Sequence, residues 1–229
     1  MTPRVAVVVP AGGAGRRMGG VRKQYIELAG EPLLLHTLRP FLAHPAVEWV
    51  VVALPAEDVP RPPAWLVDLD PRVRWVAGGE ERGDSVRQAL EAVPEEADVV
   101  LVHDAARPLV TREVIDRAIA AASRGVGAVA AVPVTDTIKE VDAEGRIVAT
   151  PERSRLWRAQ TPQAFPRAMI VDAYHRAAAD GLRATDDAAL VERYGGTVVV
   201  VEGAPENLKV TGPLDLVVTE ALLRARRGG

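Results

Sequence analysis

The chain has 229 residues, of which 48% are hydrophobic and 26% are charged, and its formal net charge is −3. These values indicate a soluble globular protein, most simply one domain over residues 1–229, and they argue against a nucleic-acid-binding protein, which would carry a basic stripe. Cysteine is absent, which excludes disulfides, thiolate metal sites and cysteine nucleophiles.

Targeting and membrane signals are not expected from the sequence. A strand begins within a few residues of Met1, which leaves no room for a signal segment. No apolar run approaches the roughly 20 residues that span a bilayer. We therefore expect a cytoplasmic protein with neither a membrane nor a nucleic acid as partner.

Short apolar runs alternate with amphipathic stretches along the chain. Valine dominates these runs without strict alternation, which is typical of strands that are covered on both faces of a parallel sheet. Helical patterns lie between them, and the pattern as a whole predicts an α/β fold: a doubly wound, mostly parallel, Rossmann-like sheet with right-handed crossovers. The predicted strands are Val5–Val9, Trp49–Leu54, Val73–Ala77, Val99–His103, Ala128–Val132 and Val198–Val201.

Two helices have clear start signals. Thr111 is expected to cap a helix that buries Val114, Ile115, Ala118, Ile119 and Ala122. Gly212 and Pro213 predict the start of a C-terminal helix. Its expected buried face comprises Leu214, Val217, Val218, Ala221 and Leu222.

One segment, at about 133–153, breaks the alternation. Two β-prone runs, Thr137–Val141 and Arg146–Thr150, flank the turn signal Asp142-Ala143-Glu144-Gly145. The segment is therefore predicted to be a protruding β-hairpin arm inserted into the domain. Because an isolated hairpin is barely stable in water, we expect the arm to pack against the parent domain or a second subunit.

The first strand runs directly into a glycine-rich loop, Pro10-Ala11-Gly12-Gly13-Ala14-Gly15-Arg16-Arg17-Met18-Gly19-Gly20. Such a loop points backbone N–H groups at an anion. A Walker loop needs Gly-Lys-Ser/Thr at its end, and a dinucleotide fingerprint needs glycine where Met18 stands, so both are excluded. Arg16, Arg17, Arg22 and Lys23 instead suit a triphosphate whose charge must be neutralised.

Lysine usage points to the same chemistry. Only three of the 28 basic residues are lysines: Lys23, Lys139 and Lys209. Lys23 follows the glycine-rich loop, and Lys209 lies in Asn207-Leu208-Lys209-Val210-Thr211. In a chain that otherwise uses arginine, a retained lysine suggests a compact, mobile charge of the kind that phosphate transfer requires.

Two further segments place polar residues after predicted strands. Gly78-Gly79-Glu80-Glu81-Arg82-Gly83-Asp84-Ser85 is a second glycine turn that leads into a helix. Either Asp84 or Ser85 caps this helix, or Ser85 bonds a base. Asp104, in His103-Asp104-Ala105-Ala106-Arg107-Pro108, either holds Mg²⁺ bridged to phosphates or closes a turn. His103 is expected to be a packing residue.

The loop Pro-Ala-Gly-Gly-x-Gly, followed by arginines and Lys23-Gln24-Tyr25, resembles the nucleotide-binding loop of the sugar-type nucleotidyltransferases. Its Lys-Gln-Tyr form is similar to that of the cytidylyltransferases that act on polyol phosphates. The likeness extends over nearly the whole chain through seven motifs in order, which include the segments above, Thr161-Pro162-Gln163 and Thr185-Asp186-Asp187. Gly12 departs from the alanine usual in that family, and Glu80 from the frequent aspartate.

The resemblance implies a role for each matching residue. Nucleotide binding is implied for Ala11, Gly12, Gly13, Gly79, Glu80, Ser85, Asp104 and Ala105, with Asp104 as the Mg²⁺ ligand. Catalytic charge neutralisation and orientation are implied for Arg17, Lys23, Arg153 and Lys209. Substrate contacts are implied for Arg107, Thr137, Thr161 and Thr185, although Thr185 is equally well read as a helix N-cap. The arm would carry Thr137 and Arg153 to a partner subunit in a homodimer.

The implied reaction is the transfer of CMP from CTP to a methylerythritol phosphate of the non-mevalonate isoprenoid route, with release of pyrophosphate. The attacking phosphate monoester is largely a dianion at pH 7 and needs no general base, in keeping with four scattered histidines. A ribitol phosphate or another sugar phosphate is an alternative substrate. A nicotinamide-binding oxidoreductase and a non-catalytic nucleotide sensor are alternatives of other classes.

Overall fold

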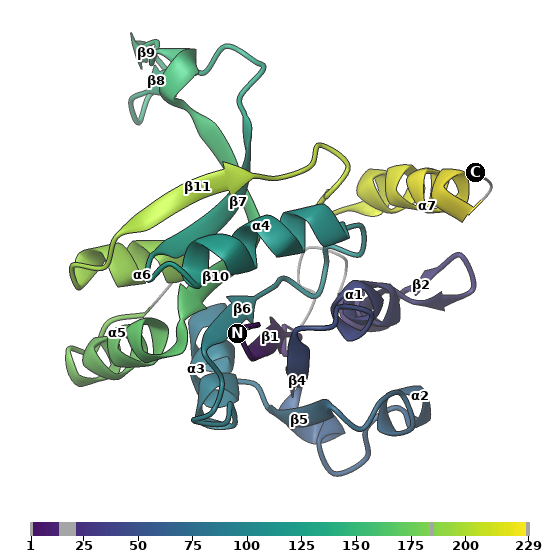
Figure 1. The fold of residues 1–229 in the computed structure, drawn as a ribbon. Helices are drawn as coiled ribbons and strands as arrows, with labels where there is room; N and C mark the ends of the chain where they lie inside the picture. The colour runs from purple at the N-terminus through teal and green to yellow at the C-terminus, as the bar shows by residue number, and fades with distance from the viewer. Residues whose placement is uncertain (1, 14–21, 184–185, 228–229) are drawn as a thin grey trace.

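The computed structural model describes residues 2–13, 22–183 and 186–227. Its central sheet has seven strands in the order β11-β7-β10-β6-β1-β4-β5 (Figure 1). The strands are β1 (Val5–Pro10), β4 (Val47–Leu54), β5 (Val73–Ala77), β6 (Val99–Val102), β7 (Gly127–Pro133), β10 (Trp157–Pro166) and β11 (Val198–Glu202). All six predicted strands are confirmed, with small changes at their ends.

Helices cover both faces of this sheet, as predicted for a doubly wound fold. One core contains Val5, Val7 and Val9 of β1 with the apolar faces of α1 (Leu33–Leu42) and α4 (Arg112–Ala122). The alternate residues of β1, Ala6 and Val8, belong to the opposite core with α3 (Arg82–Glu91), α5 (Arg167–Ala179) and α6 (Asp187–Arg193). Burial on both faces explains why the strands are continuous apolar runs.

Strand β10 was missed by the sequence analysis. It pairs antiparallel with both β6 and β7, whereas the other neighbouring pairs of the sheet are parallel. Its sequence, Trp-Arg-Ala-Gln-Thr-Pro-Gln-Ala-Phe-Pro, has none of the valine-rich character of the other strands, and its register shifts between Ala159 and Gln163. Side chains that bond loop backbone, such as Gln160, stabilise it.

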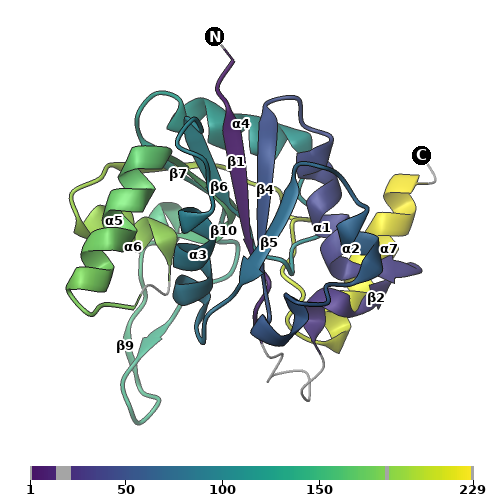
Figure 2. The same cartoon turned by 90° about the horizontal axis from the view of Figure 1, so that it is seen from below.

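The remaining short elements lie outside the central sheet. They are the 3₁₀ turns η2 (Lys23–Tyr25), η3 (Ala56–Asp58) and η4 (Arg153–Arg155), the helix α2 (Ala64–Val67), and the strand pair β2 (Glu27–Leu28) and β3 (Glu31–Pro32). Seen from below, α1, α2 and β2 lie on the side of the sheet away from α5 and α6 (Figure 2).

The predicted helix after Thr111 is α4, and all five of its predicted core residues are buried. Thr111 does stand at the N-cap position, but its side chain makes no capping hydrogen bond, so that expectation was wrong. Likewise, α6 is capped by Asp186, whose carboxylate accepts the Ala189 N–H at 3.0 Å, while Thr185 lies outside the described residues.

The C-terminal helix α7 (Pro213–Arg227) begins where predicted but buries a different face. Leu214 is 74% exposed, Val217 65% and Val218 40%, whereas Thr219 is fully buried. The helix has apolar residues on two sides, and Leu216 is half-buried on the side that faces the domain. Periodicity identified the helix but chose the wrong side, because both sides satisfy the same spacing.

The arm is a hairpin that projects from the sheet where β7 ends and β10 begins (Figure 1). Its strands, β8 (Glu140–Val141) and β9 (Ile147–Ala149), are shorter than predicted. The Asp142 carboxylate organises the turn by accepting the N–H groups of Glu144 and Arg146 at 3.1 and 2.9 Å. Apolar arm residues are solvent-exposed: Ile138, Val141, Ile147 and Val148.

Candidate active site

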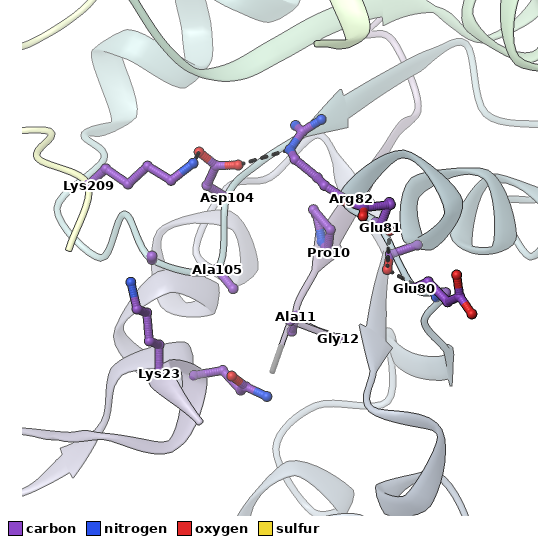
Figure 3. A pocket seen from close by; sticks show the side chains of 15 residues that line it. Pro10, Ala11, Gly12, Lys23, Glu80, Glu81, Arg82, Asp104, Ala105 and Lys209 are labelled. Carbon is purple, nitrogen blue, oxygen red and sulfur yellow. Dashed lines mark hydrogen bonds and ion pairs between the residues drawn. The ribbon is translucent and has the colours of Figure 1, made fainter. Parts of the chain in front are cut away.

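A cavity of about 380 Å³ opens at the carboxyl ends of β1, β5 and β6 (Figure 3). The chain runs from β1 through β4 to β5 on one side of β1, and then crosses through α3 to β6 on the other side. In open α/β sheets a ligand crevice forms where the winding direction reverses. The cavity is lined by Pro10, Ala11, Gly12, Gly13, Lys23, Gln24, Gly79, Glu80, Glu81, Arg82, Ser85, Asp104, Ala105, Ala106 and Lys209.

The two predicted glycine segments meet at the floor of this cavity. A Cβ atom on Gly78 would lie 2.9 Å from the Ser85 Oγ and 3.1 Å from the Leu54 carbonyl oxygen, and one on Gly12 would lie 3.3 Å from the Gly78 Cα. Side chains at these positions would therefore force the loops apart. Ser85 is buried and its hydroxyl oxygen accepts the Gly79 N–H at 3.1 Å, so Ser85 fixes the second loop as well as lining the cavity.

Helix α3 begins at this loop, and the residues at its start, Glu81 and Arg82, line the cavity. The Asp84 carboxylate accepts the Glu81 N–H at 3.2 Å, which satisfies one of the free donors at the helix start. The capping role that the sequence left open for Asp84 is confirmed. Glu80, one residue earlier, is exposed at the rim.

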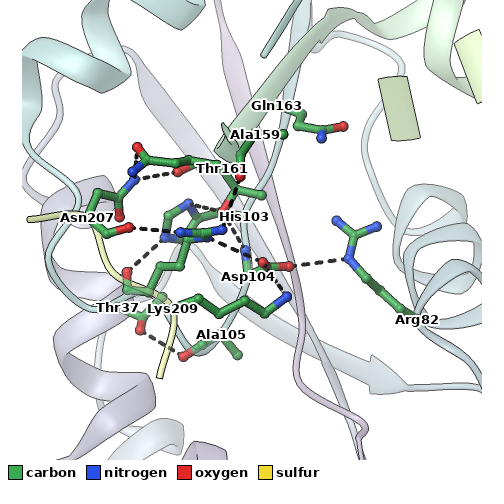
Figure 4. A network of polar contacts seen from close by, with 12 residues as sticks. Thr37, Arg82, His103, Asp104, Ala105, Ala159, Thr161, Gln163, Asn207 and Lys209 are labelled. Carbon is green, nitrogen blue, oxygen red and sulfur yellow. Dashed lines mark hydrogen bonds and ion pairs between the residues drawn. The ribbon is translucent and has the colours of Figure 1, made fainter. Parts of the chain in front are cut away.

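Asp104 is the anionic centre of the site and lies among three cations (Figure 4). Lys209 Nζ is 2.8 Å from its Oδ2, Arg82 Nε is 3.2 Å from its Oδ1, and Arg107 Nε is 3.4 Å from its Oδ2. Burial raises the pKa of Asp104, but Lys209, Arg82 and Arg107 outweigh it and hold that pKa well below its usual range. Asp104 is therefore a carboxylate throughout the physiological range.

A hydrogen-bonded chain behind Asp104 fixes its backbone. The Thr161 hydroxyl oxygen accepts the Asp104 N–H at 3.0 Å and lies 3.0 Å from His103 Nδ1. The other ring nitrogen of His103 lies 3.0 Å from the Arg107 carbonyl, which only accepts, so the proton is assigned to Nε2. Burial lowers the pKa of His103 to about 4, and His103 is thus a neutral packing residue, as expected.

Lys23 and Lys209 both line the cavity although 186 positions separate them in the chain. The Lys23 ammonium donates to the Thr211 carbonyl at 3.0 Å, which ties the first loop to the segment that carries Lys209. Beside Lys23, Gln24 is buried, and its Nε2 has no hydrogen-bond partner among the described residues. Lys139 is different: it lies on the arm and bonds Thr150 at 2.8 Å.

Several predicted residues are placed elsewhere. Thr137 and Arg153 lie on the exposed arm, where Arg153 donates to the Thr135 carbonyl, and neither is among the residues that line the cavity. Arg107 is partly buried and donates to the Asn207 and Ala159 carbonyls, and Thr161 is buried behind Asp104.

Of the four cations predicted to neutralise a triphosphate, Lys23 lines the cavity and Arg22 does not. Arg22 pairs with Asp58 at 2.5 Å and Glu57 at 2.6 Å, so its charge is compensated by η3. Arg16 and Arg17 lie outside the described residues.

Arg82 was overlooked by the sequence analysis, although it lies within the quoted second glycine segment. It lines the cavity and bonds Asp104, while its two terminal nitrogens grip the fully buried Asp187 carboxylate at 3.0 and 2.6 Å. The sequence did carry a signal, because a buried acid requires a cation partner and Asp187 directly precedes an apolar run. The partner itself, 105 positions away, has no sequence signal.

The donor set can be compared with the needs of a metal. Within residues 2–13, 22–183 and 186–227 there is no cluster of three or more His, Asp or Glu side chains able to hold a metal ion. Mg²⁺, however, is commonly held by one or two carboxylates, with substrate phosphate and water oxygens as the other ligands. Asp104 at the cavity edge fits that pattern only in the company of a phosphate ligand.

None of the helices described here is long and apolar enough to cross a membrane. The cytoplasmic location stays a prediction.

Relatives of the chain carry one consistent description. Residues 5–225 match the family model of 2-C-methyl-D-erythritol 4-phosphate cytidylyltransferase. The chain is 49% identical to the protein of that name from Symbiobacterium thermophilum, covering 96% of this chain and 92% of the relative. It is 44% identical to that from Syntrophus aciditrophicus, covering 100% of this chain and 99% of the relative.

Solved structures agree in fold. A 2-C-methyl-D-erythritol 4-phosphate cytidylyltransferase from Thermus thermophilus has a TM-score of 0.82 and 36% identity, covering 98% of this chain and 100% of that one. A 4-diphosphocytidyl-2C-methyl-D-erythritol synthase from Anaerococcus prevotii has a TM-score of 0.85 and 28% identity, covering 96% of each chain. The family model, the relatives and the shared fold together show that the chain belongs to the 2-C-methyl-D-erythritol 4-phosphate cytidylyltransferase family.

Proposed function

We propose that the chain transfers CMP from CTP to 2-C-methyl-D-erythritol 4-phosphate and releases pyrophosphate, in non-mevalonate isoprenoid precursor biosynthesis. The observation that carries the proposal is the meeting of Lys23, Lys209 and Asp104 with two glycine loops in one cavity at the switch point of the sheet. The family membership supports the same activity. A nicotinamide-binding oxidoreductase is not favoured by any of these observations.

The nucleotide half of the cavity consists of backbone and small groups. Ala11, Gly12 and Gly13 follow β1, and Gly79, Glu80 and Ser85 stand opposite them. We assign the triphosphate to the first loop and the cytosine ring to the second. The Gln24 amide, whose Nε2 has no partner within the described residues, supplies a buried donor for an acceptor atom of the ligand.

The transfer requires alignment and charge neutralisation rather than proton removal. An oxygen of the substrate phosphate forms a bond to the α-phosphorus of CTP as the bond from that phosphorus to the oxygen bridging to the β-phosphate breaks, and pyrophosphate leaves. The attacking phosphate is already largely ionised at pH 7. The state of His103 supports this account, since both of its ring nitrogens are engaged and its pKa lies at about 4.

In our proposal, the cations neutralise charge and orient the substrate phosphate. Lys23, together with the predicted catalytic residue Arg17, neutralises the charge that develops on the transferring phosphoryl group, and Lys209 orients the incoming substrate phosphate. Fixed donors of this kind act without reorganising at the moment of reaction. Lys209 suits its role because its side chain is 42% exposed, although its ammonium is held by Asp104.

Magnesium enters the proposal through Asp104. We infer that Asp104 holds Mg²⁺ together with phosphate oxygens of the nucleotide, because it is a carboxylate at the cavity edge that three cations keep ionised. When bound, the ion supplies positive charge to the triphosphate. Since Lys209 and Arg82 contact the same carboxylate, they hold it in position as well as competing for its charge.

We also propose a homodimer formed through the arm. Thr137 and Arg153 are the predicted contacts to the substrate phosphate, yet they lie on an exposed hairpin rather than in this chain's cavity. On the arm, Ile147 is 61% exposed and Val148 is 59% exposed. Neighbouring exposed apolar side chains of this kind are typical of a protein–protein interface. Thr137 and Arg153 would then serve the cavity of the second copy, together with Arg107 and Thr161 beside its Asp104. Thr185, the other predicted substrate contact, lies outside the described residues.

Sedimentation velocity tests the dimer. Ile147→Asp should shift the protein from dimer to monomer and lower turnover, whereas Leu214→Asp, an exposed apolar residue of α7, should leave the dimer intact. A wild-type protein that sediments as a monomer at micromolar concentration would contradict the dimer while leaving the proposed reaction open.

A pyrophosphate-release assay tests the reaction. Each of the four NTPs is supplied with Mg²⁺ and 2-C-methyl-D-erythritol 4-phosphate, and ribitol 5-phosphate is run beside it. Release confined to CTP with the methylerythritol substrate is expected. Faster turnover of ribitol 5-phosphate would favour the alternative substrate, and CTP binding without release would indicate a nucleotide sensor. In a separate titration, a saturable change in NADH fluorescence would indicate a nicotinamide-binding oxidoreductase.

A further inference from the structure

A polar network leads from Asp104 into the interior of the protein, and its two inner members, Asp187 and Tyr174, have no role in the reaction as described so far. It runs from Asp104 through Arg82 to Asp187, and from Asp187 to Tyr174 on α5. Asp187 is fully buried, and its Oδ1 accepts from Arg82 Nη1 at 3.0 Å and from the Tyr174 hydroxyl at 2.5 Å. Its Oδ2 accepts from Arg82 Nη2 at 2.6 Å.

The geometry of Arg82 distinguishes it from an ordinary ion pair. Its guanidinium bridges two carboxylates, with Nε on Asp104 and the two terminal nitrogens on Asp187 (the former contact is drawn in Figure 4). A planar fork is able to make both contacts at once, whereas a lysine ammonium is a single point of charge. The Arg82 side chain is 26% exposed and lines the cavity, whereas Asp187 is fully buried. Arg82 therefore connects a buried carboxylate to the surface of the cavity.

The network also joins separate parts of the fold. Arg82 is the first residue of α3 and follows the Gly78–Glu81 segment, whereas Asp187 is the first residue of α6 and Tyr174 lies within α5. Gln163 of β10 strengthens the α6 end, because its Oε1 accepts the Ala188 N–H at 2.9 Å. The start of α3, and with it the second glycine loop, is thereby held against two helices that take no part in the cavity lining.

We propose that Asp187 and Tyr174 are positioning residues that act through Arg82: they hold its guanidinium so that the Asp104 carboxylate and the second glycine loop keep the spacing that binds the nucleotide. Asp187 fixes the fork of Arg82 by a two-point contact, and Tyr174 fixes Asp187. Arg82 itself contacts the nucleotide side of the cavity. This inference rests on the proposed function only for the identity of the nucleotide.

An alternative is that the network only stabilises the fold. Buried ion pairs are weak evidence for stability by themselves, but loss of one partner is strongly destabilising because it leaves a buried charge. A stability measurement alone therefore does not separate the two roles. The separation needs a readout of nucleotide affinity and a variant that removes one hydrogen bond without creating a buried charge.

Tyr174→Phe is that variant, and the chain offers a matched control. The Tyr194 hydroxyl donates to the exposed Asp180 at 2.6 Å, which is the same chemical contact outside the network. CTP affinity is measured by titration calorimetry. We expect Tyr174→Phe to bind CTP about fivefold more weakly and Tyr194→Phe to bind it as the wild type does. In turnover the KM for CTP should rise while the KM for the polyol phosphate changes less.

Arg82→Lys tests the route of the effect. It retains the charge but loses the bridge, and we expect CTP binding to weaken by more than tenfold. If Tyr174 acts through Arg82, the double variant Tyr174→Phe/Arg82→Lys should bind CTP no more weakly than Arg82→Lys alone. Losses that multiply in the double variant, or an unchanged CTP affinity in Tyr174→Phe, would overturn the proposal.

Hydrogen exchange of the ligand-free protein gives a readout that does not depend on the reaction. Backbone amides of residues 79–86 should exchange faster in Tyr174→Phe than in Tyr194→Phe or the wild type. Should the wild type fail to transfer CMP, the proposed function fails, but this exchange result still decides the positioning role. Asp187→Asn should show the same effect more strongly, and if it does not fold, Tyr174→Phe decides alone.

Discussion

The replacement of Asp104 by asparagine gives the sharpest test of the site's electrostatics. The change keeps the size of the side chain but removes the negative charge that Lys209, Arg82 and Arg107 share. Two of these cations are largely withdrawn from water, with side chains 26% and 11% exposed for Arg82 and Arg107, so solvent replaces little of the lost interaction. We therefore expect the variant to be strongly destabilised.

The magnitude follows from the burial of the partners. Removing one partner of a buried ion pair costs about 3–5 kcal/mol. Lys209 is 42% exposed and its share is screened, so we take the lower end, about 3 kcal/mol. For a chain of this length, that corresponds to a fall in Tm of about 6–12 °C.

Urea unfolding followed by tryptophan fluorescence measures the effect. Asp172→Asn is the control, because its carboxylate is 64% exposed and lies 3.6 Å from Arg176, and it should change the free energy of unfolding by less than about 0.5 kcal/mol. Pyrophosphate should raise the stability of Asp104→Asn more than that of the wild type, since the cations left without their carboxylate bind an anion. An Asp104→Asn variant as stable as the control would refute the reasoning.

Three further expectations follow from single residues. Lys23→Ala should lower kcat/KM by at least about 10²–10³-fold with an unchanged Tm, whereas Lys139→Ala should keep wild-type turnover in the pyrophosphate-release assay. Gly78→Ala should weaken CTP binding measured by calorimetry, because its Cβ would lie 2.9 Å from the Ser85 hydroxyl. Asp70, whose pKa the Arg72 hydrogen bond lowers to about 2, should contribute stability above pH 4 that is lost as the pH falls from about 4 towards 2; a difference between wild type and Asp70→Asn that stays constant over this range would contradict the assignment.

The sequence was sufficient for six of the seven strands of the central sheet because those strands carry their own signal. Val5–Val9 and its counterparts are buried on both faces, and this environment selects β-branched residues whatever the tertiary partners are. The same logic brought Lys23, Asp104 and Lys209 together, since each follows a strand whose carboxyl end lies at one edge of the sheet. Residues positioned by regular elements were predictable from the order of those elements.

The sequence was not sufficient to predict the buried face of α7 or the presence of strand β10, because more than one structure is compatible with each local pattern. Helix α7 has apolar residues on two sides, and the choice between them depends on the neighbouring elements rather than on its own spacing. Strand β10 contains two prolines and only one β-branched residue, and it is stabilised by buried polar side chains such as Gln163. In both cases tertiary contacts decide what local propensity leaves open.

The Arg82–Asp187 contact could not be predicted for a different reason: the two residues lie 105 positions apart in the sequence. Each residue lies in a recognised motif, and each has an adequate local explanation, as a helix start for Arg82 and a residue beside an N-cap for Asp187. Only the fold shows that the two motifs share one ion pair, with Asp187 fully buried. A buried carboxylate is costly without a cation. Asp187 is therefore better explained by its ion pair with Arg82, which lines the cavity, than by its place at the start of α6.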